Sequence, residues 1–562
     1  MLQTLNPLLE DTEISWETHQ KPFQELLDRE VQPEDITQFL LDWSALENQL
    51  QHVQTVRMIR AHLDTSDQEA QDRQAAFVTE VQPEWEKMAA ALKQKLLSLD
   101  HSHLPADAVQ MVRRFQADAR TFREENVPLQ TELFSLEQEY TQISGGLKVE
   151  FQGEQKSLPQ MKPFQVSPDR TVREEAWKAV RAALSSVAPQ LNDLFLKQLK
   201  LRRQMAKNAG YPDFRAYMWD RYHRFDYTAE TCLEFHQTVK AEVVPFALEM
   251  LEQHRVKLGL DVLRPWDAYW HTVVEPGHLP ALKPFQTAEE LEAKTEQVFF
   301  AVSPKLGEMF HLFRKNGAMD LGNRPNKLPQ AYCTGLAQSG WPFMFQSAVG
   351  TMIDVMVTLH ESGHAFHLYA SLHGQRFPWN VMSGIEFAEV PSTAMEYLAL
   401  DHLSAFYTPE EMLRVKRNAI WSMVQGIPWQ CVMDAFQHWL YVEAPEEVTP
   451  EMLEDRCREL MDEFMPVPAW TGFEAERGNL WQIFHVFSIP FYFIEYAISG
   501  LGAIQLWRNH QQDPQRTIEQ YLDALAPGYT LSVPEAYERC GISFRFDRPL
   551  VRELMDFLRK QL

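Results

Sequence analysis

The residues with the clearest chemistry in this chain are two histidines and a glutamate within five positions. His360, Glu361 and His364 form the pattern His-Glu-x-x-His. If this segment is helical, the two imidazoles lie one turn apart on the same face, where they can bind one Zn²⁺. Glu361 follows the first histidine, so its carboxylate can reach a water on that metal and act as a general base. The pattern therefore predicts a hydrolytic zinc site.

The segment around this pattern has the spacing of a helix. Apolar residues recur at helical intervals from Val355 to Tyr369, and Gly374 indicates where the helix ends. The chain has 19 histidines, so the pattern could also arise by chance, and the residues downstream decide between the two interpretations.

A hydrolytic zinc needs a third protein ligand beyond the two histidines. One option is a histidine six residues after His364, but that position is Ala370. His367 lies near the same helix face, but ligands on three consecutive turns of one helix would not converge on one metal. We therefore expect His367 to be a packed or hydrogen-bonded residue.

Three acidic residues downstream are the other candidates for the third ligand. Glu386, Glu389 and Glu396 fall near one helical face, and Pro391 indicates that the helix begins close to Glu389. Burying these acids among their apolar neighbours is costly unless they meet cations or donors. A zinc ion and two imidazole N–H groups would supply both. The residues alone leave the choice among the three open.

The composition limits the class of protein. The chain has 562 residues, of which 45% are hydrophobic, so it can build a large core in two or more domains or one lobed body. Its net charge of −25 makes nucleic acid an improbable partner, because a phosphate backbone requires a basic surface. The cysteines are odd in number and show no Cys-x-x-Cys pair, so we expect reduced core residues in a cytoplasmic protein. They are Cys232, Cys333, Cys431, Cys457 and Cys540.

No segment has the pattern of a membrane anchor or a secretion signal. The N-terminus lacks a basic start and an apolar stretch, so we do not expect a signal peptide. The range from Leu480 to Trp507 is the most apolar, but Gln482, Pro490 and Glu495 interrupt it. A buried interior helix is therefore expected there rather than a membrane span.

The remaining periodicity predicts a mainly α-helical fold with a small β element. Polar helices are expected from Trp16 to about Ser144, from Thr171 to about Leu258, and from Pro409 to the end. Leu147 to Phe151 alternates with period two before a turn at Gln152–Glu154, which predicts a β-hairpin. Extended chain is expected from Asp320 to Met344, where it either offers an edge to a peptide or serves only as scaffold.

The zinc pattern and the acidic segment together resemble the thimet oligopeptidase and oligoendopeptidase F family of zinc peptidases. The resemblance rests on His360–His364 followed by Glu389 in Glu-x-Pro-Ser. It covers most of the chain from about residue 140 onward. Further segments similar to the family, in the same order, are Tyr140–Gly146, Arg264–Asp267, Ala331–Cys333, Pro342–Phe345 and His485–Tyr496. The last of these is similar to the oligoendopeptidase F and PZ-peptidase branch.

The resemblance implies roles for particular residues. Glu389 would be the third ligand of one Zn²⁺ per chain, and His485 with a tyrosine would contact the substrate and stabilise the oxyanion. The branch often has tyrosine where this chain has Phe493, so Tyr492 or Tyr496 must supply the phenol. We slightly prefer Tyr496, which lies near Gly500. Considered without the family, His485 would be a core histidine, while the two tyrosines are four residues apart and could face one cleft.

The resemblance also implies an architecture and an activity. We expect two helical lobes around a deep substrate channel, with an N-terminal helical region at 1–145 and a catalytic region at 146–562. The expected activity is zinc-dependent hydrolysis of internal bonds in short unstructured oligopeptides, with the water activated by Glu361. A metallocarboxypeptidase of related fold is a weaker alternative, because its His-Glu-Ser-Gln-Ser segment is missing. A non-catalytic peptide-binding scaffold is another, although it would not need Glu361. The oligomeric state stays open.

Overall fold

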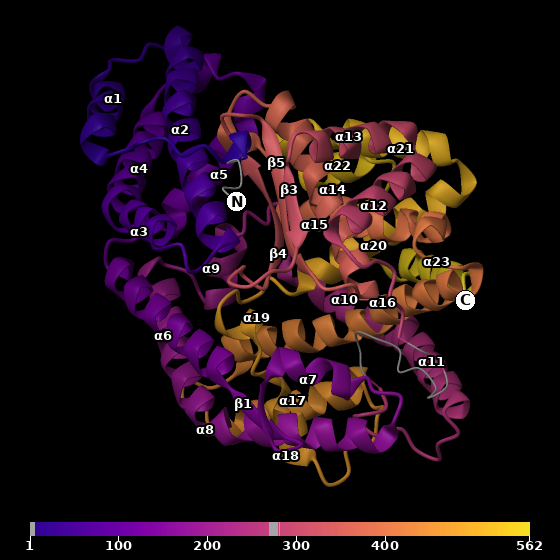
Figure 1. The fold of residues 1–562 in the computed structure, drawn as a ribbon. Helices are drawn as coiled ribbons and strands as arrows, with labels where there is room; N and C mark the ends of the chain where they lie inside the picture. The colour runs from indigo at the N-terminus through magenta and orange to yellow at the C-terminus, as the bar shows by residue number, and fades with distance from the viewer. Residues whose placement is uncertain (1–5, 269–278, 280) are drawn as a thin grey trace. The chain divides into compact units, whose positions relative to one another are not determined.

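The structure is a computed structural model that describes residues 6–268, 279 and 281–562 (Figure 1). The chain divides into two compact units, each made of three separate stretches. Unit 1 comprises Met1–Ala119, Leu282–Leu413 and Gly502–Phe544. Unit 2 comprises Arg120–Ala281, Arg414–Leu501 and Arg545–Leu562. Most described residues are helical and the strands form two small sheets, which confirms the mainly α fold with a small β element.

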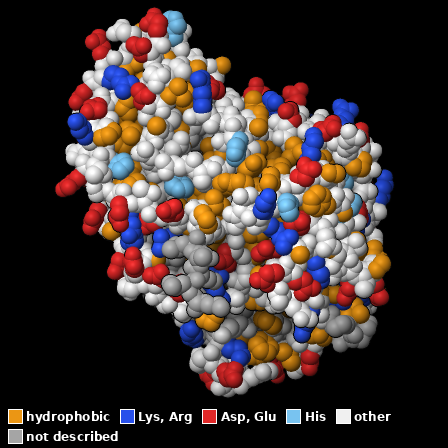
Figure 2. Space-filling view, turned by 45° about the horizontal axis from the view of Figure 1, so that its top comes forward, with side chains coloured by type: hydrophobic (Ala, Val, Ile, Leu, Met, Phe, Trp, Pro, Cys, Tyr) orange, Lys and Arg blue, Asp and Glu red, His pale blue; other side chains and the backbone are white. Residues whose placement is uncertain are grey.

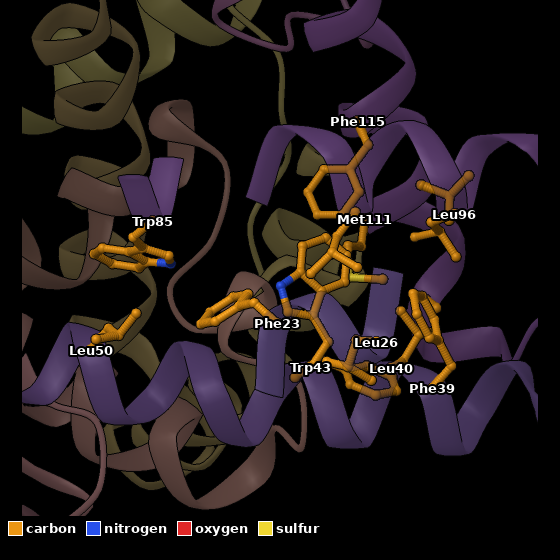
Figure 3. Packing of buried hydrophobic residues seen from close by; sticks show 14 of the residues in the cluster. Phe23, Leu26, Phe39, Leu40, Trp43, Leu50, Trp85, Leu96, Met111 and Phe115 are labelled. Carbon is orange, nitrogen blue, oxygen red and sulfur yellow. The ribbon is translucent and has the colours of Figure 1, made fainter. Parts of the chain in front are cut away.

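The N-terminal helices of unit 1 enclose a core of their own. They are α1 (Trp16–Asp28), α2 (Ile36–Leu63), α3 (Gln68–Ala76), α4 (Gln82–Ser98) and α5 (Val109–Thr121), the last of which ends in unit 2. Apolar residues of α2 at helical spacing, including Phe39 and Trp43, face this core, where the Trp43 ring lies 6.0 Å from that of Phe115 (Figure 3). Phe377, from the segment after the histidine-bearing helix, is part of the same core. The helices predicted between Trp16 and Ser144 are therefore confirmed.

The sheet of unit 1 has three strands in the order β3-β5-β4. They are β3 (Met319–Gly322), β4 (Ala331–Leu336) and β5 (Trp341–Ala348). Strand β5 pairs in parallel with β3 and antiparallel with β4, so extended chain before the histidine-bearing helix is confirmed. Because β5 is central, the strand nearest that helix has no edge to offer to a peptide, and only β3 and β4 are edge strands.

Helix α14 (Met352–Gly374) packs against β4, β5 and α15 (Ile385–Leu398) (Figure 1). Thr351 and Asp354 form a capping box at its start, and it ends at Gly374, as predicted. A Cβ at Gly374 would lie 2.6 Å from the Ala526 carbonyl oxygen, so this glycine permits a close approach. The other helices of unit 1 are α12 (Ala288–Val302), α13 (Pro304–Lys315), α21 (Pro514–Leu525), α22 (Val533–Arg539) and the C-terminal part of α20 (Ile494–Gln512).

The start predicted for α15 is wrong. Proline normally excludes helical angles from the residue before it, which placed the start near Glu389. The helix instead begins at Ile385 and contains Pro391. Phe387 and Val390 are fully buried on the N-terminal side of the proline, so packing of this turn outweighs the lost backbone hydrogen bond.

Unit 2 contains the predicted hairpin and most of the remaining helices. Strands β1 (Lys148–Phe151) and β2 (Glu154–Ser157) pair antiparallel around Gln152 and Gly153, which both have positive φ, as a tight two-residue turn requires. The helix expected from Thr171 is also confirmed, since α8 begins at Arg170 with Asp169 as its cap. The helices of this unit up to residue 257 are α6 (Asn126–Gly146), α7 (Leu158–Gln165), α8 (Arg170–Asn208), α9 (Phe214–Arg221), α10 (Ala229–Glu242) and α11 (Val244–Lys257).

The C-terminal part is helical, as predicted, but the apolar range from Leu480 to Trp507 is not one helix. Helix α19 (Phe484–Phe487) and helix α20 are separated by a break at residues 488–493. Pro490 and the positive φ of Phe491, 66°, lie in this break. The other helices are α16 (Pro409–His438), which begins in unit 1, α17 (Pro450–Phe464), α18 (Glu474–Gly478) and α23 (Arg548–Arg559).

Two predictions about the chain as a whole can be compared with the structure. No helix in the described ranges is long and apolar enough to cross a membrane. All five cysteines are free thiols, and four of them are buried. Acidic and basic side chains are interspersed over the face shown in Figure 2, so the negative net charge is spread there rather than gathered in one patch.

Candidate active site

The three residues of the predicted zinc site come from two helices that pack unusually closely. His360 and His364 lie on one face of α14, and Glu389 lies on α15. Gly363 makes the approach possible, because a Cβ there would lie only 2.4 Å from the Pro391 carbonyl oxygen. Two tyrosines from the C-terminal stretch of unit 1 also hold the backbone of α15: Tyr521 donates to the Pro391 oxygen (3.3 Å) and Tyr537 to the Glu386 oxygen (2.9 Å).

The ligand atoms of these three residues converge on one point. The Nε2 atoms of His360 and His364 each lie 3.3 Å from Oε2 of Glu389, and the three ligand atoms lie within 4.8 Å of one another. Two atoms bound to one tetrahedral zinc at about 2.1 Å are about 3.4 Å apart. The spacing of donors, two imidazoles and one carboxylate, therefore fits a zinc ion. The side chains of His360 and Glu389 are 27% and 14% exposed, so solvent reaches the site.

Further polar groups orient the candidate ligands. Nδ1 of His360 lies 2.8 Å from Oε1 of Glu396, and the Ser392 hydroxyl donates to Oε2 of Glu389 over 2.9 Å. Burial by itself would raise the pKa of Glu389, but the two histidines outweigh it and hold that pKa well below its usual range. Glu396, one of the three acids considered for ligation, thus contacts the far nitrogen of His360, as carboxylates commonly do behind a ligating histidine.

Glu361, the general base predicted from the sequence, lies on α14 directly after the first candidate ligand. It is buried next to the two histidines, and burial raises its pKa above the usual range. Its Oε2 is buried and has no hydrogen-bond partner among the residues described. Leaving a buried carboxylate oxygen without a partner costs free energy, so such an oxygen needs an explanation. Here the carboxylate belongs to the residue next to a candidate metal ligand.

Two other residues considered from the sequence lie outside the converging group. Glu386 is almost fully buried on α15 but contributes no atom to the group. His367 is fully buried, packs its ring 6.1 Å from Phe387, and has its pKa lowered to about 3 by burial and by His364. The expectation that His367 is a packed residue agrees with this placement.

A second group of possible ligands occurs in unit 2, where sequence spacing gave no signal. Cys232, Asp434 and His438 place one ligand atom each within 4.8 Å of one another. Arg215, however, donates to Nδ1 of His438 over 3.2 Å, so the proton of a neutral His438 is on Nε2, which faces Asp434. His236 contacts the same carboxylate oxygen at 2.9 Å. We interpret the cluster as a buried polar network around Asp434 rather than a metal site.

The residues expected to stabilise the oxyanion gather in unit 2. The ring centroid of Tyr496 lies 5.8 Å from that of His485 and 5.6 Å from that of Tyr492. Burial lowers the pKa of His485 to about 4, so its imidazole is neutral near pH 7 and offers one N–H donor. Phe493 lies against His485, with ring centroids 4.2 Å apart. Tyr492 lies just before α20 rather than on it, which corrects the picture of two tyrosines on one helix.

Sequence analysis missed one aromatic neighbour of this group. Tyr222, at the end of α9, has its ring 6.2 Å from that of Tyr492, and burial raises its pKa to about 12. Since 270 residues separate Tyr222 and Tyr492 in the chain, no periodicity could have connected them.

Comparison with known proteins gives two matching family models. Residues 164–556 match Peptidase family M3, and residues 10–105 match the Peptidase M3 N-terminal domain. The chain also superposes on a solved structure of PZ peptidase A with inhibitor 2, with a TM-score of 0.87 and 25% identity over 98% of each chain.

Two relatives align at lower coverage. An oligoendopeptidase F homolog of Borreliella burgdorferi is 23% identical over 296 residues, which are 51% of this chain and 48% of that protein. The oligopeptidase PepF of Bacillus subtilis is 23% identical over 252 residues, 44% of this chain and 37% of that protein. The chain therefore spans about half or less of the length of these relatives. The Peptidase family M3 model nevertheless covers residues 164–556, well over half of the chain, and the protein belongs to peptidase family M3.

Proposed function

We propose that this protein is a zinc-dependent endopeptidase that hydrolyses internal bonds of short unstructured oligopeptides. The observation that carries the proposal is the pair of imidazole nitrogens 3.3 Å from one carboxylate oxygen, with the buried Glu361 next to them. Membership of peptidase family M3 and the names of the aligned relatives, oligoendopeptidase F and oligopeptidase, support the same reaction.

In this proposal, His360, His364 and Glu389 bind one Zn²⁺ per chain. A bound zinc ion would act as a Lewis acid on the scissile carbonyl and would lower the pKa of a water molecule, so that this water can be deprotonated for attack at neutral pH. Glu396 orients the His360 ring through Nδ1, and Ser392 orients the Glu389 carboxylate.

In this proposal, Glu361 carries out the proton transfers of the reaction. Its carboxylate accepts a proton from the attacking water and passes that proton to the leaving amine. The family resemblance assigns to His485 and a tyrosine the hydrogen bonds to the carbonyl oxygen as that oxygen gains negative charge. Of these groups, His485 donates from a neutral ring, since its pKa is about 4.

The remaining expectations accompany this function as proposals. The partners are oligopeptides, with neither nucleic acid nor membrane, and the location is the cytoplasm. The substrate channel and the division into a region 1–145 and a region 146–562 also stay predictions.

An assay with internally quenched peptides tests the proposal. We expect hydrolysis of short peptides, its loss on adding a metal chelator, and its recovery on adding zinc. Mass spectrometry of the products should show internal cleavage, whereas release of single C-terminal residues would indicate a carboxypeptidase. Binding without cleavage would indicate a peptide-binding scaffold. Steady digestion of stable folded proteins would contradict a confined substrate channel.

A further inference from the structure

The break between α19 and α20 holds a residue in an unfavourable backbone conformation. Phe491 has φ of 66°, a region that residues with a Cβ rarely occupy, and its side chain is fully buried. Its neighbour in the chain is Tyr492, one of the candidate oxyanion donors. Such conformations persist only where the surroundings enforce them, and they cluster at functional sites.

Two buried side chains hold this conformation, one through the N–H of Phe491 and the other through its carbonyl oxygen. The Phe491 N–H donates to Oε1 of Gln437 over 2.8 Å, and the Phe491 carbonyl oxygen accepts from Nη2 of Arg224 over 2.6 Å. The amide of Gln437 cannot simply turn over, because its Nε2 donates to the Met433 carbonyl oxygen at 3.1 Å. Both backbone groups of Phe491 are therefore fixed by residues far away in the chain.

Arg224 is itself held in place. It forms an ion pair with Glu495, and both side chains are fully buried. Tyr227 donates to the same carboxylate oxygen over 3.0 Å, and the Trp219 ring lies 4.5 Å from the guanidinium carbon. Because Glu495 lies in the first turn of α20, this contact ties Arg224 to the helix that follows Tyr492.

The other side of the break is fixed in the same manner. Arg202, fully buried on α8, donates to the carbonyl oxygens of Val486 and Phe487 at the end of α19, the first of these over 2.9 Å. These are the residues directly after His485. The candidate donors His485 and Tyr492 therefore lie next to backbone groups that buried side chains of unit 2 hold.

We propose that Gln437 and Arg224 are positioning residues that set the orientation of Tyr492 for catalysis. The proposal rests on the proposed function, since it assumes that Tyr492 donates to the carbonyl oxygen during hydrolysis. It also reverses the slight preference for Tyr496, because the enforced conformation belongs to the residue before Tyr492. In this proposal, the positive φ of Phe491 fixes the direction of the Tyr492 phenol, and this explains why an unfavourable backbone conformation is kept.

The matched pair Gln437→Met and Gln425→Met tests the inference. Both glutamines are buried on α16, and each donates from Nε2 to a backbone carbonyl oxygen, which for Gln425 is that of Ala247 at 3.0 Å. Only Gln437 also accepts a hydrogen bond from the break, from the Phe491 N–H. Both variants should lose similar thermal stability. We expect Gln437→Met alone to lower kcat by about 10-fold or more, with KM little changed, because a small misplacement of a donor affects mainly the transition state.

A double variant separates positioning from a general loss of structure. If Gln437 acts through Tyr492, then adding Gln437→Met to Tyr492→Phe should cost little beyond Tyr492→Phe alone. Equal kcat for the two methionine variants, fully multiplied effects in the double variant, or wild-type kcat for Tyr492→Phe would each overturn the inference.

Hydrogen exchange tests the hold on the break independently of activity. The amides of residues 488, 489 and 491–493 should exchange faster in Gln437→Met than in Gln425→Met, and equal exchange would overturn the inference. If the wild-type protein cleaves no peptide, the proposed function is refuted instead. The exchange measurement would still show whether Gln437 fixes the backbone of the break.

Discussion

Helices α14 and α15 and the break before α20 position their polar side chains in different ways. In α14, the spacing of one helical turn places His360 and His364 together, and the neighbouring helix brings Glu389 to them. At the break, no regular element places Tyr492. Buried side chains from distant parts of unit 2 hold the backbone on either side of it.

This difference indicates which substitutions should affect each of the two regions. The metal-ligand region depends on side chains that a short pattern identifies, so substitutions there should act locally and strongly. The break depends on contacts that no pattern identifies, so substitutions far from Tyr492 in the sequence should change turnover. The following predictions test that contrast, beginning with the largest expected effect.

Removing a ligand should abolish metal binding. We expect His364→Ala to lose zinc almost completely and to lose activity with it, because two protein ligands rarely retain a catalytic zinc. His367→Ala, three residues further on the same helix, should keep the metal. Metal analysis of both purified variants checks this, and loss of zinc from His367→Ala would refute the ligand assignment.

Replacing the proposed base should remove the chemistry but keep the metal. Glu361→Gln preserves size and cannot accept a proton at neutral pH. We expect normal zinc content and activity lowered by at least ~10²-fold. Initial rates on a quenched peptide measure this, and a rate within a few-fold of wild type would remove Glu361 from the mechanism.

Removing one phenol should slow turnover without affecting the metal. Tyr492→Phe is expected to lower kcat by up to about 10²-fold, which is the scale for one oxyanion donor. Tyr496→Phe and His485→Ala complete the set. If all three variants turn over like wild type, then this region is only core packing and the contrast between the two regions disappears.

Weakening the contact behind His360 should lower zinc affinity moderately. Glu396→Gln removes the charge that faces Nδ1 of His360, and we expect about 10-fold weaker zinc binding. Competition with a chromogenic chelator measures the affinity. Glu386→Gln serves as the control, because Glu386 lies outside the ligand group. If Glu386→Gln strips the metal while Glu389→Gln keeps it, Glu389 is not the third ligand.

Separating α14 from α15 should cost stability. A Cβ at Gly363 would meet the Pro391 carbonyl, so Gly363→Ala should lower the free energy of unfolding by about 1–3 kcal/mol. Gly426 on α16 is a matched control, since a Cβ there meets only Gln430 at 3.8 Å. Gly426→Ala should be neutral or slightly stabilising. Equal urea midpoints for the two variants would show that the helices can move apart freely.

The sequence predicted the elements that depend on local rules and missed those that depend on distant contacts. Spacing and turn residues predict the hairpin around Gly153, the helix expected from Thr171 and the helix that ends at Gly374. The start of α15 was mispredicted, because burial of Phe387 and Val390 outweighs the local effect of Pro391.

The same distinction applies to the site. The spacing and the family resemblance together predict His360, His364 and Glu389 as ligands, and their ligand atoms lie within 4.8 Å of one another. Glu396 was considered as a ligand, yet it lies behind His360. Nothing in the sequence connected Arg224 or Gln437 to Phe491, since these contacts span 267 and 54 residues.

The tyrosines that hold α15 have a consequence for any attempt to shorten this protein. Tyr521 and Tyr537 belong to the last stretch of unit 1, which begins at Gly502, far downstream of the candidate ligands. A fragment that stops after α16 would still encode every candidate zinc ligand. It would lack both phenols that fix the backbone beside Glu389, so truncation or proteolysis near the C-terminus should impair metal retention before it removes a single ligand.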